Sequence, residues 1–262
     1  MKYFRALAPL TLVAGLALMP AAVYSDGLGL DVSPAKLELS MAPASAYNIP
    51  VTVHNSTSNT THVQASMIDF ALAQNGDYRF EKTGSRGDSL MRWASINPRE
   101  FDLPAGTTQQ VRLSLAVPSG NLNGEYAGIV FFQTRPVRRS GAVAFSARVA
   151  TKIYMTIPGT IRIDGAIARM AASRAPAGEL YRVLFKNTGN AHVYLRGQLQ
   201  VQKSGQVIDR VSFPPEELVE RGGDRLIEVT GKRLPAGKYQ AVSTIDYGGK
   251  TMTGGVINFE TQ

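Results

Sequence analysis

The chain of 262 residues contains no cysteine, only three histidines and a single tryptophan. The absence of cysteine excludes disulfide bonds, cysteine-ligated zinc, thiol catalysis and a lipidated N-terminal cysteine. The sequence also lacks the nucleophile elbow of hydrolases, the zinc-peptidase motif and the glycine-rich loops that bind phosphate. The spacing of Glu216, Glu217 and Glu220 suits a solvated loop or a short turn. We therefore expect a protein that is not an enzyme and that binds neither a metal ion nor a cofactor.

Long apolar runs are also scarce: only one occurs, and it lies near the N-terminus. Lys2 and Arg5 precede an apolar stretch that ends at Ala22, which is the pattern of a secretory signal peptide. The stretch is shorter than the ~20 residues that span a bilayer. Small residues place cleavage after Ser25, with a cut after Ala22 as the alternative. Residues 1–25 are therefore expected to be a signal peptide, and the mature protein is expected to be exported.

The charge of the chain is unbalanced, with 28 Lys and Arg against 20 Asp and Glu and a formal net charge of +8. The basic residues are scattered and form no stripe along one face, so no nucleic-acid partner is expected. One local exception is the cluster of Arg135, Arg138 and Arg139.

Short segments of alternating hydrophobicity, bounded by Gly, Pro, Asn and Asp, fill most of the chain. Examples lie at residues 51–53, 110–117 and 126–132. Asn75-Gly76 predicts a hairpin turn, because this pair accepts the positive φ of a tight turn. Strands that recur at such short intervals predict an all-β sandwich or barrel.

An internal repeat decides between these two architectures. A strand ending in Val-x-x-x-Asn, a polar turn and then His-Val occurs at residues 51–63 and again at 183–193. Two immunoglobulin-like sandwiches in tandem explain this repeat better than one barrel. Pro158-Gly159 breaks the chain between them, so the predicted domains are 26–158 and 160–262. The histidines of the repeat occupy equivalent positions, so they cannot share a metal site unless the domains clasp.

Residues 143–157 form the longest alternating segment. Its odd positions are nearly all apolar, and its fifteen residues exceed the usual strand length of ~5–6. Either the segment only closes the first sandwich, or its first half overhangs the core and offers an apolar edge to another chain by β-strand addition. The second interpretation assigns binding to Val143, Phe145, Ala147 and Val149.

The order and spacing of several motifs resemble those of the periplasmic chaperones of bacterial pilus (fimbrial) assembly. The motifs are LDVSP at residues 30–34, VTVHN at 51–55, PREFDLPAG at 98–106 with QVRL at 110–113, and TKI at 151–153. The resemblance covers essentially the whole mature chain. It implies two immunoglobulin-like domains, a cleaved signal peptide and a periplasmic location.

In that family the last strand of the first domain donates alternating apolar side chains to an incomplete pilin sandwich. The resemblance places the donor positions on Val143, Phe145, Ala147 and Val149, the same positions that the alternation indicates. It also implies pilin-like subunits and an outer-membrane usher as partners. The arginine cluster at 135–139 falls in the loop before the donor segment.

The family also anchors the carboxyl terminus of the pilin between its two domains, with one arginine and one lysine. These positions correspond here to Pro34 and Tyr154, neither of which can supply a cation to a carboxylate. Lys36 and Lys152 lie two residues away and keep the strand parity, and Arg148 is a further candidate. The resemblance therefore implies a divergent chaperone whose carboxylate anchor, if retained, uses these cations.

Two alternatives stay open at this point. The chain also fits an exported structural or adhesive double sandwich of the cell envelope, in which the 143–157 segment is paired inside its own sheet. Self-capping through the same edge would instead give a dimer. No small-molecule substrate is expected in any of these cases.

Overall fold

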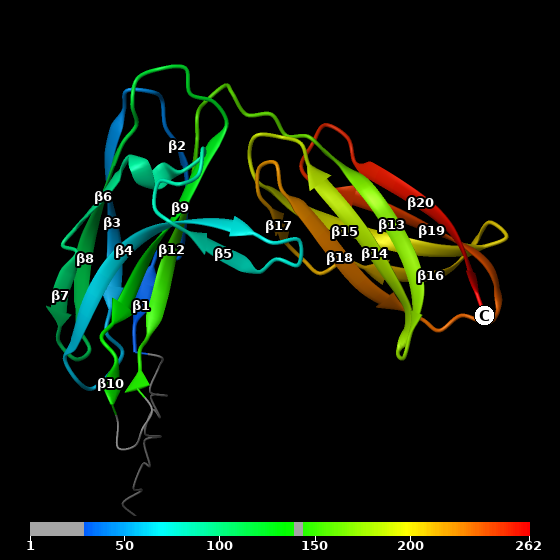
Figure 1. Ribbon diagram of the computed structural model, residues 1–262, viewed down its shortest axis with the longest axis horizontal. Helices are drawn as coiled ribbons and strands as arrows, with labels where there is room; N and C mark the ends of the chain where they lie inside the picture. Colours follow the sequence, from blue (N-terminus) through cyan, green and yellow to red (C-terminus); the bar gives the residue numbers. More distant parts are fainter. Residues whose placement is uncertain (1–28, 139–143) are drawn as a thin grey trace, which may run out of the picture.

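The computed structural model describes residues 29–138 and 144–262, which form two β-sandwich lobes set at an angle (Figure 1). The predicted signal peptide (1–25), Arg139 and Val143 lie outside the described residues. The one helix in the described ranges is a short 3-10 helix, η1 (Leu90–Arg92). No helix in this part of the chain has the length and apolarity that crossing a membrane requires.

The N-terminal lobe consists of two facing sheets and a small ribbon. One sheet has the order β1 (Asp31–Ser33), β3 (Ala46–His54), β8 (Thr108–Ala116) and β6 (Ala94–Asn97). The other has the order β2 (Lys36–Ser40), β12 (Arg148–Thr156), β9 (Glu125–Thr134), β4 (Thr61–Leu72) and β5 (Tyr78–Glu81), and β7 (Glu100–Leu103) also pairs with β4. The ribbon pairs β10 (Val137–Arg138) with β11 (Ala144–Phe145).

The C-terminal lobe repeats the two-sheet arrangement. Its smaller sheet has the order β13 (Gly165–Ala175), β14 (Gly178–Asn187) and β18 (Asp224–Gly231). Its larger sheet has the order β16 (Gln206–Ser212), β15 (Val193–Lys203), β19 (Gly237–Asp246) and β20 (Thr253–Thr261), and β17 (Glu217–Val219) pairs with β15.

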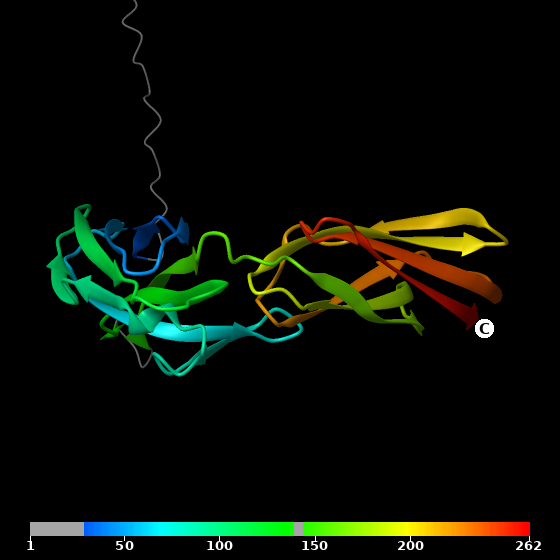
Figure 2. The ribbon, with the colours of Figure 1, turned by 90° about the horizontal axis from the view of Figure 1, so that it is seen from above.

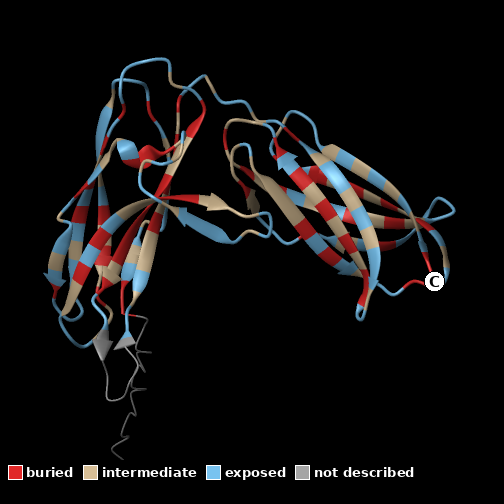
Figure 3. Cartoon of the chain, viewed as in Figure 1, coloured by how far each residue is buried: buried red, intermediate tan, exposed pale blue. Residues whose placement is uncertain are grey.

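Each lobe has its own hydrophobic core, because alternation along the strands directs every second side chain inward. Val51, Leu113 and Ile153 belong to the N-terminal core, whereas Tyr181 and Leu199 belong to the C-terminal core. Figure 3 shows the buried residues as interrupted bands along the strands of both lobes. The predicted fold class, all-β with two immunoglobulin-like sandwiches in tandem, is confirmed. The boundary between domains 26–158 and 160–262 stays a prediction.

The asparagines of the internal repeat join the end of a strand to nearby loops. Asn55 follows β3, Asn187 ends β14, and both are fully buried. The Nδ2 atom of each donates a hydrogen bond to the carbonyl oxygen four residues later, that of Asn59 or Ala191, at 2.8 Å in both cases. Each Nδ2 also donates to a carbonyl oxygen that is distant in the sequence, that of Leu103 or Glu220, at 2.9 Å. The repeated asparagine therefore makes equivalent hydrogen bonds in the two domains.

The alternating segment 143–157 is divided between two strands in the structure. β11 ends at Phe145 and β12 begins only at Arg148. Between them, the N–H of Thr134 donates to the carbonyl oxygen of Ala147 at 2.9 Å, and the Oγ1 of Thr134 accepts the N–H of Ala147 at 2.9 Å. A side-chain hydroxyl thus replaces a ladder hydrogen bond, and the regular strand is interrupted there.

Removing either asparagine amide should destabilise its own domain. In Asn55→Ala or Asn187→Ala, buried carbonyl oxygens lose their donor, and each unsatisfied group costs about 1–3 kcal/mol. We expect the free energy of unfolding of that domain to fall by about 2–4 kcal/mol in chemical denaturation. Asn48→Ala, at an exposed position of β3, is the matched control and should have little effect. Equally small effects for all three variants would contradict the assigned role.

Candidate functional site

The two domains meet where the β4–β5 hairpin reaches toward the C-terminal lobe (Figure 1; Figure 2). Main-chain hydrogen bonds cross this junction from Glu125 N–H to the Asn190 carbonyl oxygen at 2.9 Å, and from Leu226 N–H to the Gln74 carbonyl oxygen at 2.8 Å. Gly124 has a φ of 73°, and a Cβ there would approach the Asn190 carbonyl oxygen to 2.7 Å. Only glycine fits this close contact.

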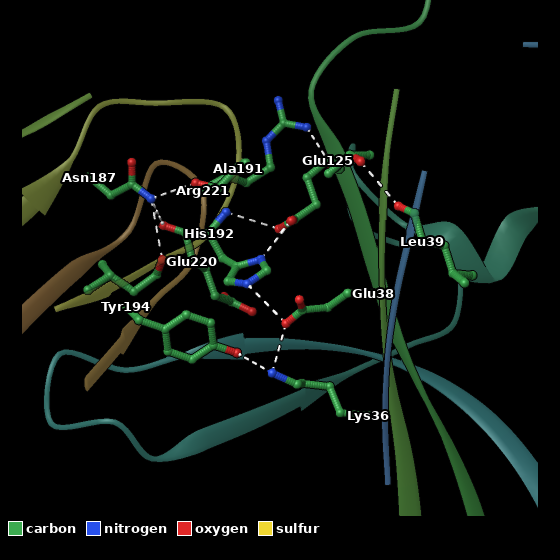
Figure 4. A network of polar contacts seen from close by, with 12 residues as sticks. Lys36, Glu38, Leu39, Glu125, Asn187, Ala191, His192, Tyr194, Glu220 and Arg221 are labelled. Carbon is green, nitrogen blue, oxygen red and sulfur yellow. Dashed lines mark hydrogen bonds and ion pairs between the residues drawn. The ribbon is translucent and has the colours of Figure 1, made fainter. Parts of the chain in front are cut away.

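A buried glutamate–histidine pair holds the junction (Figure 4). The carboxylate of Glu125 accepts a hydrogen bond from the main-chain N–H of His192 at 3.1 Å, and its Oε2 lies 2.6 Å from the ring Nδ1. Arg221 donates to the carbonyl oxygen of Glu125 at 2.6 Å. The ring of Tyr154 packs on the imidazole, with centroids 4.2 Å apart. Because a buried carboxylate is costly without partners, this pair favours one arrangement of the two domains.

A row of polar side chains continues from this pair toward the solvent. Glu38 lies 3.8 Å from the Nε2 of His192 and 2.8 Å from the Nζ of Lys36. Lys36 also donates to the hydroxyl of Tyr194 at 3.1 Å. The hydrogen bond to Glu38, followed by that to Tyr194, raises the pKa of Lys36, and the same ion pair lowers the pKa of Glu38. Both side chains are therefore charged at neutral pH.

A cavity of about 380 Å³ lies between the domains, beside Lys36 and Tyr194. Lys36 and Lys152 line it from the N-terminal domain, where they are register neighbours in the parallel β2–β12 pair. Glu216, Glu217 and Arg225 line it from the C-terminal domain, and Glu217 and Arg225 form an ion pair with each other. Two adjacent ammonium groups from one sheet therefore face a wall on which Arg225 neutralises one of the two glutamates, Glu217.

Two of the three predicted anchor residues come together in this cavity. An ammonium group has three donors, so Lys36 and Lys152 can each bind a carboxylate oxygen in addition to their present partners. Lys152 donates to the hydroxyl of Tyr78 at 2.8 Å. Arg148 lies apart from them, with its guanidinium carbon 3.7 Å from the ring centroid of Phe131.

The residues at the family's own anchor positions cannot replace these lysines. Pro34 lies between β1 and β2, and its carbonyl oxygen accepts a hydrogen bond from Thr151 at 2.8 Å. Tyr154 is 1% exposed, and desolvation raises the pKa of its hydroxyl. That hydroxyl has no hydrogen-bond partner among the described residues.

One edge of β12 is only half covered. β9 pairs with the whole strand, whereas β2 pairs with it only from Lys152 onward. The N–H of Lys152 points to the β2 side, where it donates to the carbonyl oxygen of Ala35 at 2.9 Å. By alternation, the backbone groups of Arg148 and Ala150 face the same side. Within 29–138 and 144–262 no strand pairs with them there, so this half of the edge is open.

The predicted donor residues have different environments. Val143 lies outside the described residues, and Phe145 is 64% exposed. Ala147 is half-buried, and Val149 is half-buried against the N-terminal core. Phe145 is thus available to a partner, whereas Val149 already contributes to the packing of its own domain.

Sequence reasoning missed the acidic residues of the junction. The prediction that Glu220 lies in a solvated loop is wrong, because its carboxylate accepts the N–H of Leu72 from the other domain at 3.0 Å. Burial raises the pKa of Glu220 to about 7. Glu125 carried no signal beyond its place after Gly124. No cluster of His, Asp and Glu suited to a metal ion occurs in the described ranges.

Comparisons with known proteins give one match to a family model, within the N-terminal lobe, and matches to solved structures that cover most of the chain. A family model described as WxL Interacting Protein, peptidoglycan binding domain, matches residues 36–134. Among curated proteins, no sequence matches this chain. A solved structure described as "Chaperone-tip adhesin complex is vital for synergistic activation of CFA/I fimbriae biogenesis" has a TM-score of 0.50 at 12% identity, over 86% of this chain and 97% of its own.

Two further solved structures are fimbrial chaperones. The class 5 fimbriae chaperone CfaA has a TM-score of 0.49 at 12% identity, over 89% of this chain and all of its own. The E. coli chaperone DraB has a TM-score of 0.45 at 18% identity, over 89% of this chain and 98% of its own. The similarity at a TM-score of 0.50 shows a shared two-domain fold. The resemblance to pilus chaperones is therefore confirmed at the level of fold.

The junction should respond to pH through Glu220. Its pKa in the folded protein, about 7, exceeds the ordinary 4.5, so folding favours the protonated form. The stability of the folded state should therefore fall as pH rises from about 4.5 to 7, by the contribution of this one group. In thermal melts from pH 5 to 8, Glu220→Gln should gain stability relative to the unaltered protein as pH rises. Parallel curves for the two proteins would show that Glu220 is not responsible.

Proposed function

We propose that the protein is a non-enzymatic periplasmic chaperone that binds pilin-like subunits by β-strand donation. The open half-edge of β12 beside Arg148 and Ala150 carries this proposal. Strand addition needs unpaired N–H and C=O groups on an edge, together with apolar side chains that fill the partner. Phe145, just before β12, supplies an exposed apolar side chain. The fold shared with a fimbrial chaperone complex supports the same function.

The interdomain cavity supplies the second contact, with the carboxyl terminus of the subunit. A donated-strand partner would pair with β12 beside Arg148 and Ala150. It must end near Lys152, because β2 occupies the edge of β12 from that residue onward. Lys152 lines the cavity, so the end of the partner strand lies at the cavity. Lys36 and Lys152 then meet the terminal carboxylate with charge-assisted hydrogen bonds, which are about twice as strong as neutral ones. In this proposal the domain 26–158 binds the subunit, 160–262 completes the cavity, and an outer-membrane usher receives the complex.

The proposal is tested by co-expressing the mature protein with pilin-like products of neighbouring genes and measuring co-purification. Phe145→Asp should abolish capture, because the charge cannot enter the apolar groove of a subunit. Loss of one buried aromatic side chain, about 1.5–3 kcal/mol, corresponds to about a 10- to 150-fold weaker complex. The melting temperature should not change, since Phe145 is 64% exposed.

Val256→Asp is the matched control for this experiment. Val256 is 57% exposed on β20 of the C-terminal domain, and the substitution should leave capture unaffected. A complex that survives Phe145→Asp, or a Phe145→Asp variant that mainly loses thermal stability, would contradict strand donation. Val149→Asp is unsuitable as a first test, because Val149 packs against the N-terminal core.

A second candidate function is binding to peptidoglycan in the cell envelope. The match of residues 36–134 to a peptidoglycan-binding domain model favours it, and that range lies within the N-terminal lobe. This candidate corresponds to the envelope-associated double sandwich that the sequence left open. Co-sedimentation of the mature protein with purified peptidoglycan sacculi tests it, and a protein that stays in the supernatant would exclude it.

A further inference from the structure

The outer face of the N-terminal β2–β12–β9–β4–β5 sheet carries a group of aromatic rings that strand donation does not use. Tyr78 and Phe80, on β5, are 39% and 48% exposed. Phe131 of β9 lies beneath them and is 7% exposed. Together with Arg148 and Lys152 of β12, these residues are called the aromatic platform here.

The rings of the platform form an ordered surface. Tyr78 and Phe80 have centroids 6.1 Å apart and planes inclined by only 19°, so the two rings are nearly parallel and stacked. Phe131 meets Phe80 edge-on at 5.2 Å and supports it from below. Both exposed rings point to the same side because they lie two residues apart on one strand. A contiguous exposed apolar patch on a protein surface often marks a binding site.

Two cations border the rings. The guanidinium carbon of Arg148 lies 3.7 Å from the Phe131 centroid and 5.9 Å from that of Phe80. The Nζ of Lys152 lies 5.4 Å from the Tyr78 centroid. Neither cation has a carboxylate within 4 Å in the part of the chain that the structure describes. The platform therefore has a net positive charge and suits a ligand that combines flat apolar faces with acidic groups.

A peptidoglycan strand has this combination of features. The C–H faces of pyranose rings stack flat on aromatic side chains, and the stem peptides carry carboxylates that pair with arginine and lysine. The matched range 36–134 includes Tyr78, Phe80 and Phe131, while β12 adds the two cations from outside that range. A donated strand relies on the other face of β12, where Val149 packs into the sandwich core. The platform therefore lies apart from the donor side chains, but it shares Tyr78 and Lys152 with the interdomain cavity.

We propose that the aromatic platform binds the glycan strand of peptidoglycan, with Tyr78 and Phe80 stacked on sugar rings and Arg148 and Lys152 bound to stem-peptide carboxylates. This inference rests on the second candidate function, peptidoglycan binding, and assigns its site. Because the two cations contribute Coulomb attraction at an exposed surface, added salt weakens binding. The stacked rings retain part of the affinity at high salt.

The test is co-sedimentation of the mature protein with purified sacculi, comparing the unaltered protein with the double variant Tyr78→Ala/Phe80→Ala. We expect the double variant to bind at least about 10-fold more weakly, the factor that corresponds to about 1.4 kcal/mol. Tyr47→Ala is the matched control, because Tyr47 is 56% exposed on β3 of the opposite sheet, and it should bind normally. The single variant Phe80→Ala, which removes a half-exposed ring, should also bind more weakly without a change in melting temperature.

The outcomes separate the site from the function. If the unaltered protein sediments and both ring variants sediment equally well, the platform is not the site, although peptidoglycan binding stands. If the unaltered protein does not sediment, peptidoglycan binding itself fails. If the ring variants instead lose co-purification with a pilin-like subunit and keep their binding to sacculi, the platform belongs to a protein partner and the proposal is overturned.

Discussion

The rest of the structure depends on the partial pairing of β2 with β12. β1 pairs with β3 in one sheet, the chain crosses at Pro34, and β2 then pairs with β12 in the other sheet. Because it joins β12 only at Lys152, the backbone of Arg148 and Ala150 stays unpaired on that side among the described residues. The same register sets Lys36 beside Lys152. One arrangement of strands therefore produces both the open edge and the pair of cations at its end.

The junction between the domains gives this arrangement a fixed geometry. Glu125 and His192 form a buried contact between the lobes, and Gly124 allows the main chains to approach. The cavity exists only while the lobes keep this angle, since its two walls come from different domains. Alternation along β12 then separates two roles. Its odd side chains face the sandwich core and the donor side, and two of its even side chains, Arg148 and Lys152, belong to the aromatic platform.

Patterns with local causes could be predicted from the sequence, and those that depend on the placement of the two domains could not. The alternating segments and the repeated Asn55 and Asn187 predicted the tandem sandwiches. These patterns could be interpreted from the sequence because the interactions that cause them lie within one lobe. The parity argument for Lys36 and Lys152 anticipated their meeting, because strand register preserves parity. The division of the 143–157 segment was missed, since the hydroxyl of Thr134 causes it from another strand. Burial of Glu220 was missed because the other domain provides it.

Hydrogen exchange of the protein, resolved to single amides along β12, tests the central claim most directly. The N–H groups of Arg148 and Ala150 should exchange rapidly, because they face the open half of the edge. The N–H of Lys152, which donates to Ala35, should be protected. Protection of Arg148 and Ala150 to the same degree as Lys152 would show that the edge is closed and would contradict the account of strand donation.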